Sequence, residues 1–216
     1  MLYASRLKGH LFQGAIKCLF EHANYRVVPY GIEATLREIA CMGKDGYRSL
    51  DLPSAISLTP DFILLDESQS KKWIVEVKYR QSYHDNDELI QKMKTQVEIF
   101  KDVYFVLFIQ NPNTKLALGK TPSTHIRTFH SRYENGKLMV SVRINKEMVY
   151  VPWERGINKF YSFFNIHEIF NGLERNADEK TLQTTMSIIL NLNLDDGNNK
   201  YYSSAQRGDA PEAGSS

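Results

Sequence analysis

The chain has 216 residues, of which 42% are hydrophobic and 24% are charged, a composition that fits one main globular domain. Its two cysteines are too few for a disulfide framework, and no apolar run approaches the ~18 residues of a membrane span. We therefore expect a protein of the reducing cytoplasm, without a signal peptide or a membrane partner. The formal net charge is +2, and residues 195–216 hold four acidic and two basic side chains, which leaves a mildly basic body that is compatible with a nucleic-acid partner.

Residues 7–23 carry apolar side chains at helical spacing and predict an amphipathic helix. Residues 26–30 then predict a first strand, which Pro29 closes or places at a sheet edge. A helix is expected over residues 34–42. The glycines and polar residues of 43–57 indicate an irregular surface loop, for which we expect a role in substrate contact.

Residues 60–65 and 72–78 predict two strands joined by a polar turn, and hence a hairpin. A turn centred between the strands places Asp61 opposite Glu76, with Cβ atoms roughly 4.5–5.5 Å apart. Lys78 lies two residues along the same strand and therefore shares the face of Glu76. The other face carries two apolar pairs, Phe62 with Val75 and Leu64 with Trp73.

Two facing carboxylates destabilise a sheet unless a cation lies between them. Asp61 and Glu76 therefore indicate a site for a hard divalent ion such as Mg²⁺, which takes oxygen ligands and keeps several waters. Lys78 would point into the same site, where it can orient or deprotonate a metal-bound water and offset the charge of a phosphate. The plainer interpretation is that Pro60-Asp61 belongs to a turn and that Glu76 and Lys78 form a solvent-facing charge pair.

The combination of Pro60-Asp61 with Glu76-Val77-Lys78 resembles the PD-(D/E)xK nuclease superfamily, which has the restriction-endonuclease-like fold. The resemblance implies that Asp61, Glu76 and the Val77 carbonyl hold Mg²⁺, that Mn²⁺ substitutes for it, and that Asp61, Glu76 and Lys78 are catalytic. The segment from Gly9 to Gln13 resembles the opening helix of Mrr-like and Holliday-junction-resolvase-like members.

Those members usually have a glutamate where this chain has Gln13, so Gln13 is a ligand candidate with a weaker amide oxygen. Glu21 and Glu33 are the alternative acids. Each also has a plainer interpretation, Glu21 as a solvated helix residue and Glu33 as a charge at a helix N-terminus.

A helix is expected from residue 87 to residue 100, and Gln96 with Phe100 loosely resembles the Gln-x-x-x-Tyr element of RecB-type nucleases. Gln96 and Arg80 are the candidate substrate-binding residues, and a polar position at the edge of a helix–sheet interface is the plainer interpretation of Gln96. Residues 103–109 predict a buried strand, and the helix before it is a crossover that makes the last pairing parallel. The order α-β-β-β-α-β is the core order of the resembled superfamily, an α/β fold with a mixed sheet.

Residues 124–129, 137–144 and 148–152 predict short strands that either extend the sheet or form a C-terminal β-addition. Two terminal helices are expected over residues 160–173 and 179–192. The domain is expected to span residues 1–194, with its core in 5–110 and additions in 111–194, followed by a disordered tail over 195–216. Six basic side chains of the later region could contact phosphates or simply be solvated: Lys115, Lys120, Arg127, Arg132, Lys137 and Arg143.

The sequence thus predicts a metal-dependent nuclease that hydrolyses phosphodiester bonds, with DNA as the expected partner. The alternative is a nucleic-acid-binding or assembly subunit that keeps the fold but does not hydrolyse. Gln13 favours this alternative, because the resembled nucleases usually have a glutamate there. A homodimer or a larger nuclease assembly is compatible with either function.

Overall fold

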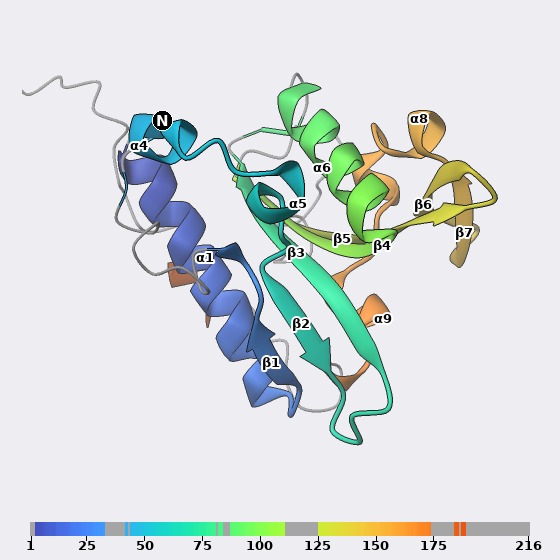
Figure 1. Cartoon of the computed structure of the whole chain (residues 1–216). Helices are drawn as coiled ribbons and strands as arrows, with labels where there is room; N and C mark the ends of the chain where they lie inside the picture. The colour runs from blue at the N-terminus through green and yellow to red at the C-terminus, as the bar shows by residue number, and fades with distance from the viewer. Residues whose placement is uncertain are drawn as a thin grey trace, which may run out of the picture.

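The computed structural model describes residues 3–32, 42, 44–80, 82–83, 87–110, 125–173, 184–185 and 187–188. Within this part of the chain, seven strands form one mixed sheet in the order β1-β2-β3-β4-β5-β6-β7 (Figure 1). The strands are β1 (Arg26–Pro29), β2 (Phe62–Leu65), β3 (Lys72–Arg80), β4 (Asp102–Ile109), β5 (Ile126–Glu134), β6 (Lys137–Ile144) and β7 (Glu147–Pro152). The helices are α1 (Tyr3–His22), α4 (Lys44–Ser49), α5 (Ser54–Ser57), α6 (Asp87–Phe100), α8 (Trp153–Gly156), the 3₁₀ turn η1 (Phe160–Ser162) and α9 (Ile166–Ile169).

The α/β class and the predicted order of the first long elements are confirmed, since α1, β1, β2, β3, α6 and β4 follow one another in that sequence. β1 lies at one edge of the sheet, as its proline indicated. The parallel pairing of β3 with β4 across the α6 crossover is also confirmed. β5, β6 and β7 join antiparallel to the same sheet, so of the two options for this region the structure shows the extended sheet.

The hairpin of β2 and β3 has the predicted register, with Phe62 opposite Val75 and Leu64 opposite Trp73. Its turn is held by Asp66, whose carboxylate accepts hydrogen bonds from its own loop, including the Lys71 backbone N–H at 2.9 Å. These bonds satisfy the turn locally, so the register does not depend on distant contacts.

Two hydrophobic clusters cover the two faces of the sheet. α1 contributes buried residues at helical spacing to the first cluster, which includes Val75 and Val77 of β3. α6 packs on the opposite face over β4 and β5 and contributes to the second cluster. Because side chains of a strand alternate between faces, Glu76 and Lys78 point to the α6 side. The buried apolar residues of α1 include Phe12, Ile16, Leu19 and Phe20, and the buried residues of α6 are Leu89, Met93, Gln96 and Val97.

The prediction of an irregular loop over residues 43–57 is wrong, because α4 and α5 lie there. α5 is a single turn that follows Pro53 and has no buried residue, so it has no amphipathic pattern to detect. Thr59 supports its end, since the Thr59 hydroxyl lies within hydrogen-bond distance of the Ala55 carbonyl at 3.0 Å. Local turn chemistry rather than core packing therefore forms this element.

The continuous helix predicted over residues 160–173 is also wrong. After η1 the chain becomes extended, and Phe164 exchanges two backbone hydrogen bonds with Thr128 of β5, at 2.8 and 2.9 Å. Asn165 then opens α9 with a capping box that includes Glu168. The four phenylalanines of this stretch are buried, and their packing overrides helical spacing.

Several predictions lie outside the described residues, wholly or in large part. They are the helix over 34–42, Glu33, the two lysines of residues 111–120, the second terminal helix and the tail. No helix in the described ranges is both long enough and apolar enough to cross a bilayer.

Candidate functional site

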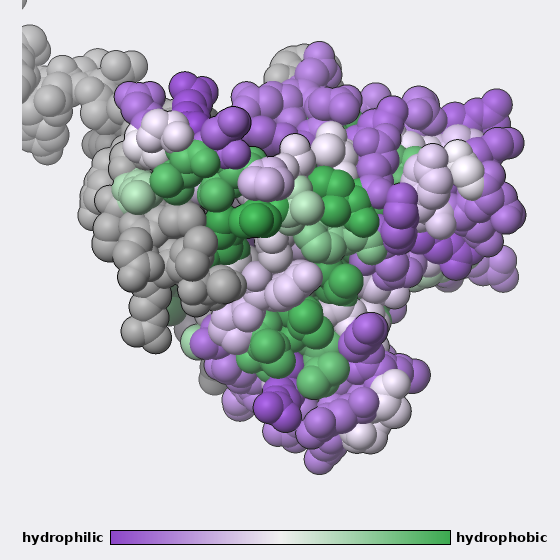
Figure 2. All heavy atoms as spheres, viewed as in Figure 1, coloured by the Kyte–Doolittle hydropathy of each residue, from purple (hydrophilic) through white to green (hydrophobic). Residues whose placement is uncertain are grey.

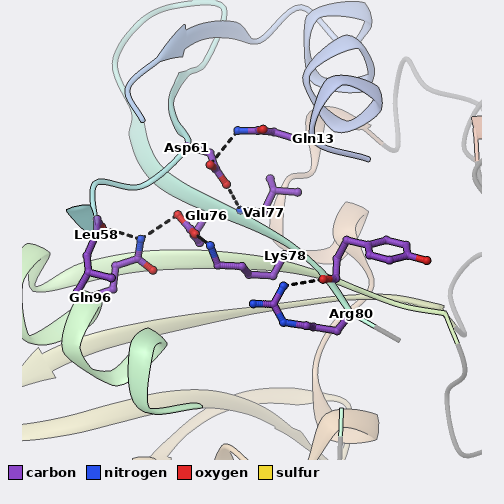
Figure 3. Close-up of polar contacts among 9 residues, drawn as sticks. Gln13, Leu58, Asp61, Glu76, Val77, Lys78, Arg80 and Gln96 are labelled. Carbon is purple, nitrogen blue, oxygen red and sulfur yellow. Dashed lines mark hydrogen bonds and ion pairs between the residues drawn. The ribbon is translucent and has the colours of Figure 1, made fainter. Parts of the chain in front are cut away.

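Asp61 lies at the point where β2 separates from β3. It is held by α1 and β3, whose contacts Figure 3 shows, and by the two residues that follow β1. Its carboxylate accepts a hydrogen bond from the Val77 backbone N–H at 2.7 Å and another from Gln13 Nε2 of α1 at 2.8 Å. Its carbonyl accepts from the backbone N–H groups of Tyr30 and Gly31, at 2.9 and 3.2 Å. The Val77 N–H has no backbone partner on β2, because the two strands have separated there. The Asp61 carboxylate accepts this hydrogen bond instead, which fixes it beside β3.

Glu76 is a buried carboxylate, with only 2% of the residue exposed. One of its oxygens accepts a hydrogen bond from Gln96 Nε2 of α6 at 2.8 Å, and the other is ion-paired with Lys78. Gln96 also donates to the Leu58 carbonyl, which follows α5, at 2.9 Å. A buried carboxylate is costly unless it is paired and hydrogen-bonded, so these contacts both permit and orient Glu76.

Lys78 lies on the same face as Glu76 and retains 28% exposure of its side chain. Burial disfavours the ammonium and by itself would lower the pKa of Lys78, but the negative charges of Glu76 and Asp61 outweigh it and raise that pKa above its ordinary value. Lys78 is therefore a cation near neutral pH. A protonated lysine can orient water and offset phosphate charge, but it cannot accept a proton. The charged state therefore fits the first role better than the role of a general base.

The three predicted catalytic residues are thus brought together by the turn before β2 and by one face of β3. The position of Asp61 at the splayed end of the hairpin, and the two-residue spacing of Glu76 and Lys78, agree with the predicted register. Gln13 also lies at the site, but it approaches Asp61 through its amide nitrogen, the donor that a carboxylate oxygen accepts directly.

The donors present fit a hard divalent cation. Asp61 and Glu76 supply carboxylate oxygens, each of which keeps lone pairs beyond those used in its hydrogen bonds. The Val77 carbonyl points to the same side of β3 as the N–H that meets Asp61, because both groups of a strand residue point to one neighbour. In the described part of the chain no three His, Cys, Asp or Glu side chains cluster to hold a metal. Two carboxylates and a carbonyl are a donor set that Mg²⁺ or Mn²⁺ can use while keeping several waters.

Arg80 follows Lys78 on the same face of β3 and donates from Nη1 to the Tyr79 carbonyl at 2.7 Å. Burial lowers the pKa of Arg80, and the charges of Glu76 and Glu88 oppose that shift. Glu76, Lys78 and Arg80 therefore form a line along the strand, with two cations next to the carboxylate.

Glu21, one of the alternative ligands, is not brought to the site. It pairs with Lys17 one turn earlier on α1, at 3.7 Å, and its side chain is 47% exposed. Its position fits the solvated helix residue that the sequence also allowed. The other alternative, Glu33, lies outside the described residues.

The basic residues of β5 and β6 are largely engaged within the protein. Arg132 pairs with Glu134 at 2.8 Å, and Arg143 pairs with Glu168 of α9. Arg127 donates to the Asn165 side chain. These three side chains are therefore held by partners within the protein rather than simply solvated.

The Leu58 carbonyl was missed at the sequence level, because a backbone oxygen carries no signal in the side-chain pattern. The Gln96–Phe100 spacing was the only indication of α6 at this site, and it did not identify Glu76 as the partner of Gln96. Comparison of the chain with protein-family models, with curated proteins and with solved structures gives no match.

Proposed function

We propose that this protein is a metal-dependent nuclease of the PD-(D/E)xK type that hydrolyses phosphodiester bonds, with DNA as the expected substrate. The observation that carries the proposal is the convergence of Asp61, Glu76 and Lys78 at the splayed end of one hairpin, where each side chain is held by specific contacts. Apart from the short helices α4 and α5 between β1 and β2, the first half of the chain has the order α-β-β-β-α-β, which supports a restriction-endonuclease-like core.

Asp61, Glu76 and the Val77 carbonyl would hold Mg²⁺, with Gln13 as an additional candidate. The bound ion would supply Lewis acidity and an activated water. Lys78 would orient that water and offset negative charge at the phosphate. Gln96 positions Glu76 from α6, and outer contacts of this kind commonly determine how well a ligand is aimed.

A second candidate function is nucleic-acid binding or assembly without hydrolysis. The observation in its favour is that the chain already compensates its own carboxylates, since Gln13 donates to Asp61 and Lys78 pairs with Glu76. A protein that binds nucleic acid without cleaving it would gain stability from such internal pairing and would need no divalent metal ion. The two functions differ in two observable results: whether the protein binds a divalent metal, and whether it forms cleaved nucleic acid.

The direct experiment incubates the full chain with supercoiled, linear, branched and single-stranded DNA and with RNA, in Mg²⁺, Mn²⁺ or EDTA. We expect cleavage that requires the metal and is lost in Asp61→Asn and Glu76→Gln. Glu67→Gln, which changes an exposed carboxylate of the same hairpin, is the matched control and should cleave as the wild type does. Binding without product in every metal would establish the second function instead.

A further inference from the structure

The face of β1, β2 and β3 that lies opposite α1 continues from the site towards the hairpin turn. The registers of the two strand pairs place Val28, Ile63 and Ile74 in one row across this face. The next row is Arg26, Leu65 and Lys72. Figure 2 shows apolar surface over β2, below α6, on this side of the molecule. We call the two rows the hairpin face.

The hairpin face begins directly beside the candidate catalytic residues. Tyr30 donates its backbone N–H to the Asp61 carbonyl, so the row before Val28, Ile63 and Ile74 contains Tyr30, Asp61 and Glu76. A strand advances about 3.3 Å per residue, so Lys72 lies roughly 13 Å along β3 from Glu76. That length corresponds to about four nucleotides at the ~3.4 Å spacing of one stacked strand.

An aromatic pair lies at the site end of the hairpin face. The rings of Tyr30 and Phe100 meet edge to face with centroids 6.3 Å apart. Tyr30 is 36% exposed, which leaves part of its ring available to a ligand. Phe100 is the last residue of α6 and stands one turn beyond Gln96, the residue that positions Glu76.

Two cations flank the apolar rows at the far end. Arg26 and Lys72 are exposed, and among the described residues neither takes part in an ion pair. The Asp66 carboxylate of the adjoining turn is engaged by the hydroxyls of Ser68 and Ser70. The hairpin face thus offers aromatic and aliphatic surface next to the carboxylates and positive charge beyond.

This pattern matches a single strand better than a duplex. A duplex presents phosphates and sugars outward and keeps its base faces stacked inside, so apolar rows find no complement on it. The bases of a single strand expose their faces, which pack on aromatic and apolar side chains while its phosphates meet cations. A protein partner could also cover apolar rows, but the two exposed cations beyond them favour an anionic ligand, which the phosphates of a strand supply.

We propose that the hairpin face binds a single-stranded segment of the substrate, with bases against Tyr30 and the Ile63–Ile74 row and phosphates at Arg26 and Lys72. The substrate class is therefore a nucleic acid with an unpaired stretch, such as an overhang, flap or loop. The proposal deepens the proposed function, on which it rests, by stating which form of nucleic acid reaches Asp61 and Glu76.

The test measures binding apart from cleavage. Fluorescence anisotropy in EDTA compares a short single-stranded DNA, the RNA of the same sequence, a blunt duplex and a duplex with an overhang. We expect the single-stranded and overhang ligands to bind at least tenfold more tightly than the blunt duplex. DNA is the expected ligand, because it is the expected substrate of the proposed function, and the RNA of the same sequence serves as the comparison.

Variants connect that preference to the hairpin face. Tyr30→Ala should weaken single-strand binding roughly 5- to 100-fold, the range of one lost base–aromatic contact, whereas Tyr30→Phe keeps the ring and the affinity. Arg26→Ala and Lys72→Ala, both at exposed positions, should each reduce the slope of log affinity against log salt by about 0.7. Lys159→Ala changes an exposed lysine between α8 and η1 and is the matched control.

Equal binding of duplex and single strand, or unchanged single-strand affinity in Tyr30→Ala and in both cation variants, overturns the proposal. Sedimentation adds one more overturning result, a wild-type dimer that Ile74→Thr separates into monomers, since the hairpin face would then join two copies. Failure here is distinguishable from failure of the nuclease function. Asp61→Asn removes cleavage but leaves single-strand binding in EDTA, so each activity has its own readout.

Discussion

At the scale of single residues, the site is defined by how two carboxylates are compensated. Glu76 is almost fully buried and depends on Gln96 and Lys78, whereas Asp61 depends on the Val77 N–H and on Gln13. Each carboxylate therefore has one donor from the hairpin strand and one from a helix. α1 and α6 lie on opposite faces of the sheet, so the site joins the two layers.

Lys78→Ala tests the cation of the site. We expect cleavage to fall by about 10²- to 10⁴-fold, the usual size of a lost proton-transfer or water-orienting group, with metal affinity largely kept. Stability should fall by about 2 kcal/mol, less than for a fully buried pair, because Glu76 loses its partner while Lys78 was still 28% exposed. Single-turnover kinetics, Mn²⁺ calorimetry and urea denaturation measure these three quantities. Full turnover in Lys78→Ala would remove this residue from the mechanism.

Gln13 can be tested by changing its charge. Gln13→Glu places a second carboxylate against Asp61, where the wild type has a hydrogen bond of 2.8 Å. We expect a lower melting temperature in EDTA from like-charge repulsion, and a larger rise on addition of Mg²⁺ because a hard cation gains an anionic ligand. Gln13→Ala should weaken metal binding without that charge effect. Identical Mg²⁺ affinities in all three proteins would place Gln13 outside the metal site.

At the scale of elements, the short helix α8 is fixed by close packing against strands. Gly156 closes α8 where the chain meets β6 and β7, and an added Cβ would lie 2.4 Å from Val140 Cγ1 and 2.7 Å from Val151 Cγ2. Neither contact can be relieved by a flexible side-chain end, because both valines are rigid and belong to the sheet. Only glycine fits this approach.

Gly156→Ala is therefore expected to destabilise the protein by about 1–3 kcal/mol, as overpacking of a close-packed interface does. The matched control is Gly9→Ala in α1, where nothing lies within 4 Å of the added Cβ. That change should stabilise the helix by roughly 0.5–1 kcal/mol, since glycine is a poor helix former. Urea denaturation of both variants decides the matter, and loss of stability in Gly9→Ala rather than in Gly156→Ala would contradict the packing.

At the scale of the whole molecule, the continuous sheet buries tyrosines whose phenols must stay neutral. Burial, together with the neighbouring Asp102 and Tyr150 and against the opposing charge of Arg132, raises the pKa of Tyr104 to about 12. Burial likewise raises the pKa of Tyr83, whose hydroxyl donates to the Ile157 carbonyl. In the unfolded chain a tyrosine ionises near pH 10.

These tyrosines predict how stability changes in alkali. Between pH 10 and 12 the unfolded chain loses phenolic protons that the folded chain retains, so the free energy of unfolding should fall as the pH rises. The stabilisation that these neutral phenols provide is fully present below pH 10. It is lost as the pH rises towards the pKa that the phenols have in the folded protein. Tyr104→Phe, which keeps the ring stacked on His130, should flatten the fall. Urea denaturation at pH 9, 10 and 11 measures the free energy of unfolding of both proteins. If this free energy falls equally with pH in the wild type and in Tyr104→Phe, Tyr104 is not the source of the fall.

The sequence by itself determined the local parts of this protein. Alternation in β2 and β3 and the polar turn between them set the register, and therefore the face shared by Glu76 and Lys78. Helical spacing gave α1 and α6, and the apolar run of β4 with a crossover before it gave the parallel pairing. These features depend on residues close in the chain, which is why periodicity is enough to find them.

Only the tertiary structure decided the contacts between distant segments. The donation of Gln96 to Glu76 and to the Leu58 carbonyl, and of Gln13 to Asp61, joins residues 20 or more positions apart. The break of the helix expected at residues 160–173 has the same origin, since Phe164 satisfies its backbone groups on Thr128 of β5. Burial and hydrogen-bond satisfaction across the sheet outweigh local propensity at these points, and a sequence pattern carries no record of which distant partner supplies them.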